Sequence, residues 1–166
     1  MSNDPGLLAL IIGNKGILLK ICHLYCPDRH AREDLMQEII YQLWRSGKSY
    51  DANYRFSTWM YRVALNVAIS FYREGRRKGH ALPLSELHLE IHDDPLESPL
   101  ENQRMAWLRS CVQGLKEFDR ALILLYFEEK SHREIAEILG ISESNVATKI
   151  SRIKERLKKC ILNHQS

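Results

Sequence analysis

The 166-residue sequence has few cysteines, few prolines and no long apolar run. No continuous apolar stretch is longer than the seven residues 121–127, and the one nearest the N-terminus is residues 7–12. A membrane-spanning helix needs roughly 20 such residues, so we expect no membrane insertion. No basic leader precedes the stretch, which argues against a secretory signal. Four cysteines in a chain of this size favour a reducing compartment over a disulfide scaffold. These absences predict a soluble cytoplasmic protein.

Strand signals are nearly absent, because no segment alternates clearly between apolar and polar residues and no Asn-Gly or Asp-Gly turn occurs. Apolar residues instead recur at helical spacing throughout. The first expected helix, 7–25, is weakened by Gly13 and Gly16, and Asp28 is expected to cap the second. Further helices are expected at 57–74, 100–115 and 118–129, followed by a short and a long helix. The fold class predicted is all-α.

Charge is unevenly distributed along the chain, although the net charge of +3 is too small to indicate a nucleic-acid binder. Residues 1–79 hold 12 Lys and Arg against 7 Asp and Glu, and residues 130–166 hold 8 against 4. Residues 80–101 hold six acidic side chains, no Lys or Arg, and three prolines. We therefore expect two small helical domains, 1–79 and 102–166, joined by a flexible acidic linker at 80–101. Basic segments at both ends suggest contact with a polyanion.

The C-terminal part has the pattern of a helix-turn-helix. Ser131 and Glu134 form a capping-box signature, Gly140 is placed to end the short helix, and Ser142 is placed to cap the next. The long helix carries an inward stripe of Val146, Ile150, Ile153, Leu157 and Ile161. Such a helix enters the major groove with its polar face outward. The alternative is an ordinary helical hairpin with a solvated basic face.

The outward positions of this long helix suit DNA contact. Asn145 and Arg152 are suited to base edges, Lys149 and Ser151 to phosphate, and Glu143 to a cytosine amine. The full set of candidates for duplex binding is Arg133, Ser142, Glu143, Ser144, Asn145, Thr148, Lys149, Ser151 and Arg152.

The N-terminal half interleaves aromatic and basic residues, which suits unpaired bases and phosphate. Trp59, Val63, Val67 and Phe71 recur at four-residue spacing, and we interpret these four as a core stripe. The loop aromatics and the arginines are the stronger functional candidates.

Three other classes of protein are weighed. An enzyme is disfavoured, because Glu33, Asp34 and Glu38 are accompanied by no glycine loop, His-x-x-x-His or nucleophile motif. A zinc module would use Cys22, His23 and Cys26, but Cys111 and Cys160 lack matching partners in the sequence. We interpret the cysteines as small buried hydrophobes and expect no metal and no cofactor. A stand-alone helix-turn-helix regulator stays open as the alternative function.

Two stretches resemble a known family. Residues 31–39, 43–44 and 56–66 closely resemble region 2 of bacterial RNA polymerase sigma factors of the extracytoplasmic-function (ECF) group in the sigma-70 family. Residues 134–142, with Asn145 and Val146, resemble region 4 of the same group, and the resemblance covers nearly the whole chain. Two departures are Ser70, where many members have Asp, and residues 117–120, which replace a Leu-Pro-x-Arg opening and would alter how the C-terminal helices begin.

The resemblance implies a sigma factor that takes core RNA polymerase to specific promoters. It implies partners: the clamp helices of the largest polymerase subunit, the flap, promoter DNA and an anti-sigma factor. The implied polymerase-binding residues are Asp34, Leu35, Gln37, Glu38 and Trp44. The implied residues for binding and melting the minus-10 element are Tyr50, Asn53, Tyr54, Phe56, Trp59, Arg62, Asn66, Arg73, Arg76 and Arg77. The helix-turn-helix would read the minus-35 element as duplex, and the acidic linker would thread toward the polymerase active centre.

Overall fold

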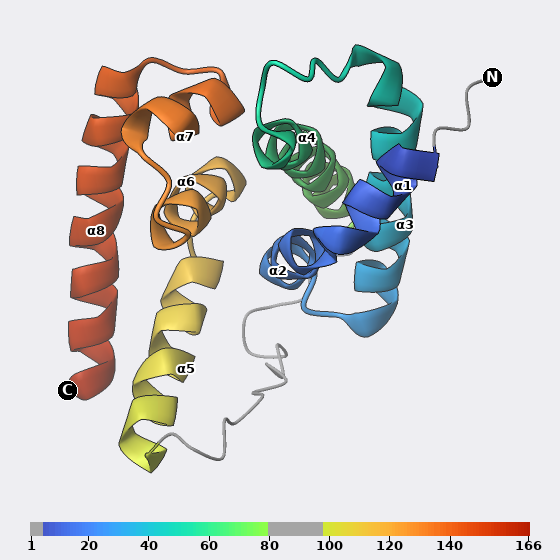
Figure 1. The fold of residues 1–166 in the computed structure, drawn as a ribbon. Helices are drawn as coiled ribbons and strands as arrows, with labels where there is room; N and C mark the ends of the chain where they lie inside the picture. Colours follow the sequence, from blue (N-terminus) through green and yellow to red (C-terminus); the bar gives the residue numbers. More distant parts are fainter. Residues whose placement is uncertain (1–4, 80–97) are drawn as a thin grey trace. The chain divides into compact units, whose positions relative to one another are not determined.

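The computed structural model describes residues 5–79 and 98–166 (Figure 1). Within these ranges the chain forms eight α-helices and one short 3₁₀ helix, and no strand. The described helices fall into two compact units, unit 1 within residues 5–79 and unit 2 within residues 98–166. The all-α class is confirmed. Most of the predicted linker, residues 80–97, lies outside the described residues, and residues 99–101 belong to the first turn of a helix.

Unit 1 is built from a bundle of three helices with a short fourth helix against it. Helices α2, α3 and α4 pack against one another, and α1 packs on α3. The bounds are α1 Pro5–Gly13, α2 Lys15–Tyr25, α3 Arg29–Arg45, the 3₁₀ helix η1 Ser46–Ser49, and α4 Phe56–Arg77.

The first predicted helix is interrupted. Residues 7–25 form two helices that meet at Asn14 with a bend of 59°. The Asn14 side-chain amide donates a hydrogen bond of 2.8 Å to the Leu10 carbonyl. Gly13, Asn14 and Gly16 are all poor helix formers, so the weak point in the sequence becomes a break.

No single helix of the described ranges is long and apolar enough to cross a membrane. Helices α1 and α2 meet such a length and composition test only as a bent pair. Ile11, Leu18 and Ile21 of this pair are buried within unit 1.

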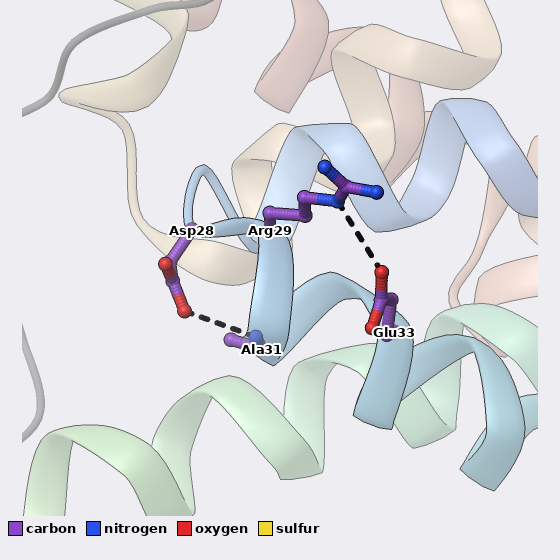
Figure 2. Close-up of polar contacts among 4 residues, drawn as sticks. All are labelled: Asp28, Arg29, Ala31 and Glu33. Carbon is purple, nitrogen blue, oxygen red and sulfur yellow. Dashed lines mark hydrogen bonds and ion pairs between the residues drawn. The ribbon is translucent and has the colours of Figure 1, made fainter.

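Helix α3 begins as predicted. Asp28 is in an extended conformation, and its carboxylate accepts a hydrogen bond of 3.0 Å from the Ala31 N–H (Figure 2). Arg29 and Glu33 form an exposed ion pair of 3.4 Å one turn further on, which contributes little to stability. Leu35, Ile39 and Leu43 bury their side chains completely, as their four-residue spacing predicts.

The predicted core stripe of α4 is wrong by one position. The fully buried residues are Met60, Ala64 and Ala68, with Tyr61 and Leu65 beside them. Trp59, Val63, Val67 and Phe71 are only half-buried and flank the core. Both stripes have helical spacing, but only the first has two alanines, whose small size lets α4 approach its neighbours closely. The distance between α4 and its neighbouring helices therefore determines which of the two stripes is buried, and hydropathy alone does not distinguish them.

Unit 2 is organised around its last helix, since α8 contacts α5, α6 and α7 (Figure 1). The bounds are α5 Pro99–Gln113, α6 Glu117–Phe127, α7 His132–Leu139 and α8 Glu143–Gln165. Val146, Ile150, Ile153 and Leu157 are buried as predicted, whereas Ile161 is half-buried.

Arg120 explains how residues 117–120, where the sequence departs from the family's Leu-Pro-x-Arg pattern, start helix α6. Its guanidinium is buried and donates to the Leu115 carbonyl at 3.0 Å and the Gln113 carbonyl at 2.6 Å. These carbonyls follow the end of α5 or belong to it, so Arg120 ties the two helices together. Glu117 and Asp119 lie in the first turn of α6, where their negative charges interact favourably with the positive end of the helix dipole.

The four cysteines divide into two kinds. Cys111 of α5 and Cys160 of α8 form a disulfide with a Cα–Cα distance of 5.9 Å, which corrects the expectation of unpaired hydrophobic thiols. The two residues are 49 positions apart, and only the packing of α5 on α8 brings them together. Cys22 and Cys26 are free and buried, and burial raises their thiol pKa to about 11 and about 12.

Candidate functional sites

The turn between α7 and α8 is held by a complete set of local hydrogen bonds. Ser131 and Glu134 form a reciprocal capping box, with bonds of 3.1 and 2.9 Å between side chain and backbone. Gly140 ends α7 in the left-handed conformation, at φ 69° and ψ 35°, where a Cβ would be strained. The Ser142 hydroxyl then accepts from the Asn145 N–H at 3.1 Å and starts α8. All three predictions are confirmed.

The first turns of α8 present an exposed polar surface, which we call the α8 face. Eight of the nine sequence-predicted duplex-binding residues are exposed: Arg133, Ser142, Glu143, Ser144, Asn145, Thr148, Ser151 and Arg152. Asn145, Thr148 and Arg152 lie at i, i+3 and i+7, so they follow one line along the helix. Lys149 is half-buried, with its ammonium 5.6 Å from the centre of the Phe118 ring.

Some polar groups of the α8 face already have intramolecular partners. The Thr148 hydroxyl donates to the Ser144 carbonyl at 3.0 Å, and the Ser142 and Ser144 hydroxyls lie 3.2 Å apart. Arg133 lies 3.6 Å from the Glu137 carboxylate on the surface of α7. The α8 face can therefore offer short polar side chains and cationic side chains to the major groove of DNA, while Ser142 fixes the start of the helix.

A second candidate surface follows the solvent side of α4. Trp59, Arg62, Asn66, Arg73 and Arg77 are spaced by three, four, seven and four residues, which places them along one face of the helix. The four polar residues are exposed, and Trp59 is half-buried at the N-terminal end of the row. Arg76 is also exposed, on an adjacent line. The α4 row thus combines one indole with cationic and amide side chains.

The loop before α4 adds an aromatic cluster to the same end of the helix. The rings of Tyr50, Phe56 and Trp59 lie with their centres 5.3 to 5.4 Å apart in all three pairs. The Tyr50 hydroxyl donates to the Tyr54 carbonyl at 3.2 Å, and the Asp51 carboxylate accepts from the Asn53 N–H at 2.9 Å. Tyr54 itself is 61% exposed. The loop is therefore pinned at its base, and Tyr54 and Asn53 lie on the surface.

The predicted polymerase-binding residues do not all lie on the surface. Asp34, Gln37, Glu38 and Trp44 are exposed on α3, and the Trp44 side chain is 49% exposed. Leu35 is fully buried in the core of unit 1, so it fixes the position of α3 and offers no surface to a partner.

Asp34 and Glu38 line a groove between α3 and α4, which we call the acidic groove. Its other lining residues are Gln42, Asn66, Val67, Ser70, Phe71 and Glu74. Lys78 hydrogen-bonds the exposed Glu74 carboxylate at 3.0 Å and lowers its pKa. Sequence reasoning missed Gln42 and Glu74, although their helical spacing from Glu38 and Ser70 was a usable signal. Asn66 borders both this groove and the α4 row.

Unit 2 also has an apolar groove that sequence reasoning did not identify. It lies between α6 and α8, with exposed Phe127 and Leu162 at its edges and the Lys154 ammonium 4.1 Å from the Tyr126 ring. Its remaining lining residues are Ile123, Leu157, Lys158 and Ile161.

Comparisons with known proteins match both units. Residues 10–78 match the family model for sigma-70 region 2, and residues 105–157 match the model for sigma-70 region 4. The chain is 31% identical over 130 residues to the RNA polymerase sigma factor YlaC of Bacillus subtilis (strain 168), covering 76% of this chain and 75% of YlaC. It is 28% identical over 156 residues to the ECF RNA polymerase sigma factor SigW of the same strain, covering 87% and 83%.

The fold has a solved counterpart as well. The structure of CnrH in complex with the cytosolic domain of CnrY superposes with a TM-score of 0.68 at 22% identity, covering 99% of this chain and 92% of that chain.

Region 2 followed by region 4 defines an RNA polymerase sigma factor. The chain belongs to the ECF group of the sigma-70 family, and it directs transcription by RNA polymerase. Members of this family are transcription initiation factors and not enzymes.

Proposed function

We propose that this sigma factor reads the minus-35 element as duplex through α7 and α8, and the minus-10 element as an opened single strand through the α4 row and its preceding loop. Unit 1 then serves as region 2 and unit 2 as region 4, in the cytoplasm. The observation that carries the proposal is the α8 face, where a locally capped helix presents short polar residues first and Arg152 two turns later.

Duplex reading is supported by the shape and charge of the α8 face. Ser144 and Asn145 are short enough to let the N-terminus of α8 approach the DNA, where the helix dipole favours phosphate. The Asn145 amide offers a donor and an acceptor, and the Arg152 guanidinium offers paired donors, so both side chains can distinguish base edges in the major groove. Lys149, held over Phe118, is better placed for phosphate than for a base.

Single-strand binding is supported by the chemistry of unit 1. Unpaired bases stack on aromatic rings, and each such stack contributes roughly 1–3 kcal/mol. The cluster of Tyr50, Phe56 and Trp59 supplies rings, exposed Tyr54 and Asn53 supply groups at its rim, and the arginines of the α4 row supply phosphate contacts. A base flipped out of a duplex needs such partners, since unstacking costs a few kcal/mol.

Polymerase binding is assigned to the exposed face of α3 with the acidic groove. Asp34 and Glu38 make this groove anionic, whereas the charge of Glu74 is balanced by Lys78. An anionic surface fits a basic helical surface on the polymerase and orients the encounter. The acidic charge also argues that DNA does not enter the groove. Gln37 and Trp44 extend the same surface along α3.

A titration against bacterial core RNA polymerase, followed by transcription from a promoter library, tests the whole proposal. We expect tight binding and new start sites that share two sequence elements. Asp34→Ala combined with Glu38→Ala should weaken polymerase binding without loss of helix content. Glu33→Ala, which removes a carboxylate paired with Arg29 on the same helix, is the matched control. Unchanged polymerase affinity of the double variant would disprove the α3 assignment.

Promoter opening tests the minus-10 assignment separately. Trp59→Ala and Tyr54→Ala should leave polymerase affinity unchanged and reduce the reactivity of unpaired thymines in the minus-10 region to permanganate. His23→Ala, an exposed change on α2 away from the loop, should behave like the parent. Equal permanganate reactivity in all four proteins would remove the aromatic cluster from the proposal.

We also propose that an anti-sigma protein regulates this chain. CnrH, which shares the fold, is seen in complex with the cytosolic domain of CnrY. Support on this chain comes from the exposed acidic groove and the apolar groove of unit 2, each open to a partner segment. Purification of the tagged protein across growth conditions tests the idea, and consistent recovery without a stoichiometric partner would contradict it.

A further inference from the structure

The two cysteines of unit 2 lie beside a histidine that no part of the proposed function uses. The sulfur atoms of Cys111 and Cys160 and a ring nitrogen of His164 all lie within 4.8 Å of one another. Among the described residues, this is the one group of three or more Cys, His, Asp or Glu close enough to share a metal ion. Two thiolates and an imidazole form a donor set that suits Zn²⁺.

Helix α8 supplies two of these ligands and helix α5 supplies the third. Cys160 and His164 are one turn apart on α8, so both side chains project from one side of that helix. Trp107 and Cys111 are one turn apart on α5 and face them. The Trp107 indole stacks on the His164 imidazole, with ring centres 6.1 Å apart and planes 8° apart. The stack restrains the orientation of the imidazole, as supporting groups do at zinc sites.

The spacing fits a tetrahedral ion once the disulfide is opened. Thiolate ligands about 2.3 Å from zinc lie about 3.8 Å from each other by tetrahedral geometry. This separation is within the 4.8 Å that bounds the distances among the three ligand atoms. Cys111 is buried, Cys160 is half-buried and His164 is exposed, so an ion has a path in from solvent. Three protein ligands leave the fourth position for water.

We propose that reduced Cys111 and Cys160, together with His164, form a binding site for a thiophilic divalent cation such as Zn²⁺, and that the disulfide is the oxidised form of the same site. A dithiol reductant opens the disulfide by exchange: two electrons pass to the cysteine sulfurs, and the reductant becomes a disulfide itself. Zinc then displaces two protons, one from each thiol, and takes neutral His164 as third ligand. Either form links α5 to the C-terminal half of α8.

The other cysteines of the chain do not offer such a site. Cys22 and Cys26 are buried, and burial raises their pKa values to about 11 and about 12, which disfavours the thiolates that a metal requires. The His23 ring is 2.8 Å from the Leu19 carbonyl through Nδ1. The zinc module considered at Cys22, His23 and Cys26 is therefore less suited to zinc than the cluster of unit 2.

Zinc titration of the full-length protein tests the proposal. The protein is reduced with a dithiol, freed of it under anaerobic conditions, and titrated with Zn²⁺ against a chromophoric chelator. We expect one zinc per reduced chain and none per oxidised chain. Cobalt(II) in place of zinc should give thiolate charge-transfer bands and the intense visible absorption of a tetrahedral site.

Matched variants decide which residues bind. Cys111→Ser and Cys160→Ser should lose the site. His164→Ala, an exposed change that does not endanger folding, should weaken zinc binding at least about tenfold, since losing even an outer-shell partner costs that much. His132→Ala, an exposed histidine of α7, and Cys22→Ser should bind zinc like the parent.

Three results would overturn the proposal: no zinc on the reduced protein, zinc binding that survives Cys111→Ser, or zinc binding that is unchanged by His164→Ala. None of these results depends on promoter recognition, so the zinc site and the proposed function are tested independently.

Discussion

Each unit exposes a basic helix, but the two helices are held in different ways. Helix α8 starts at a side-chain cap, follows a left-handed glycine and is preceded by a capping box. Helix α4 starts at Arg55 with no side-chain cap bond, and its position comes from burying Met60, Ala64 and Ala68. Local hydrogen bonds fix the start of the helix that we assign to duplex DNA. Packing fixes the helix that we assign to the opened strand.

This difference between α4 and α8 predicts which substitutions each unit tolerates. A helix fixed by packing is sensitive to the loss of buried volume and indifferent to its first residues. A helix whose start is fixed by a cap loses a modest amount of stability when the cap is removed, and substitutions on its exposed face change stability little. The cysteines follow the same division, with two buried thiols in unit 1 and a covalent link in unit 2.

The largest expected effect is in unit 1. Leu35→Ala removes a fully buried side chain from the α3 core, and we expect a loss of about 2–5 kcal/mol in the free energy of unfolding of that unit. Gln37→Ala, two residues away on the exposed side, should change stability by less than about 0.5 kcal/mol while weakening polymerase binding. Denaturant unfolding followed by circular dichroism and a polymerase titration measure both. Equal stability of the two variants would contradict the separation of packing from surface roles.

The disulfide predicts an effect confined to unit 2. Reduction should lower the free energy of unfolding of that unit by about 2–4 kcal/mol, because the bond closes a long loop. Unit 1 should not respond, since Cys22 and Cys26 are already thiols. Hydrogen exchange of peptides from α5 and α8, compared with peptides from α2 in the same sample, separates the units. Faster exchange in α2 upon reduction would show that the effect is not local.

The contrast between local hydrogen bonds and long-range packing also determines which features can be predicted from the sequence. The caps at Asp28, Ser131 and Ser142 are correct to the residue, because a cap is a bond between neighbours in the chain. The α4 stripe is misplaced by one position, because its choice depends on how closely α2 and α3 approach Ala64 and Ala68. The pairing of Cys111 with Cys160 has no local signature at all. Long-range packing is thus what the sequence pattern does not contain.

The candidate site residues also separate into those that follow from local helical periodicity and those that depend on packing between helices. Exposed positions such as Asn145 and Arg152 follow directly from the helical period once the buried stripe of α8 is recognised. Glu74 and Gln42 join the acidic groove only because α3 and α4 pack side by side. Leu35 shares a short sequence motif with Asp34 and Glu38, yet its side chain is fully buried in the core while theirs are exposed.

Arg152 provides the next largest expected effect. Arg152→Ala should weaken binding to the upstream promoter element by about 1–3 kcal/mol and relax sequence preference at one base position. Lys159→Ala, an exposed cation further along α8, should reduce affinity less and equally for all sequences. Competition binding with duplexes drawn from the selected promoters measures both variants. A sequence-independent loss for Arg152→Ala would reassign that residue to phosphate.

The smallest expected effect tests the cap itself. Ser142→Ala removes the hydroxyl that accepts from the Asn145 N–H, and we expect a loss of about 1 kcal/mol in the stability of unit 2. Ser144→Ala, two residues on, removes a hydroxyl that makes no cap bond, so it should cost less than about 0.5 kcal/mol. Hydrogen exchange at the first turns of α8 is the measurement. If both serines gave the same exchange rates, the start of α8 would be fixed by packing, as α4 is, and the contrast between the units would fail.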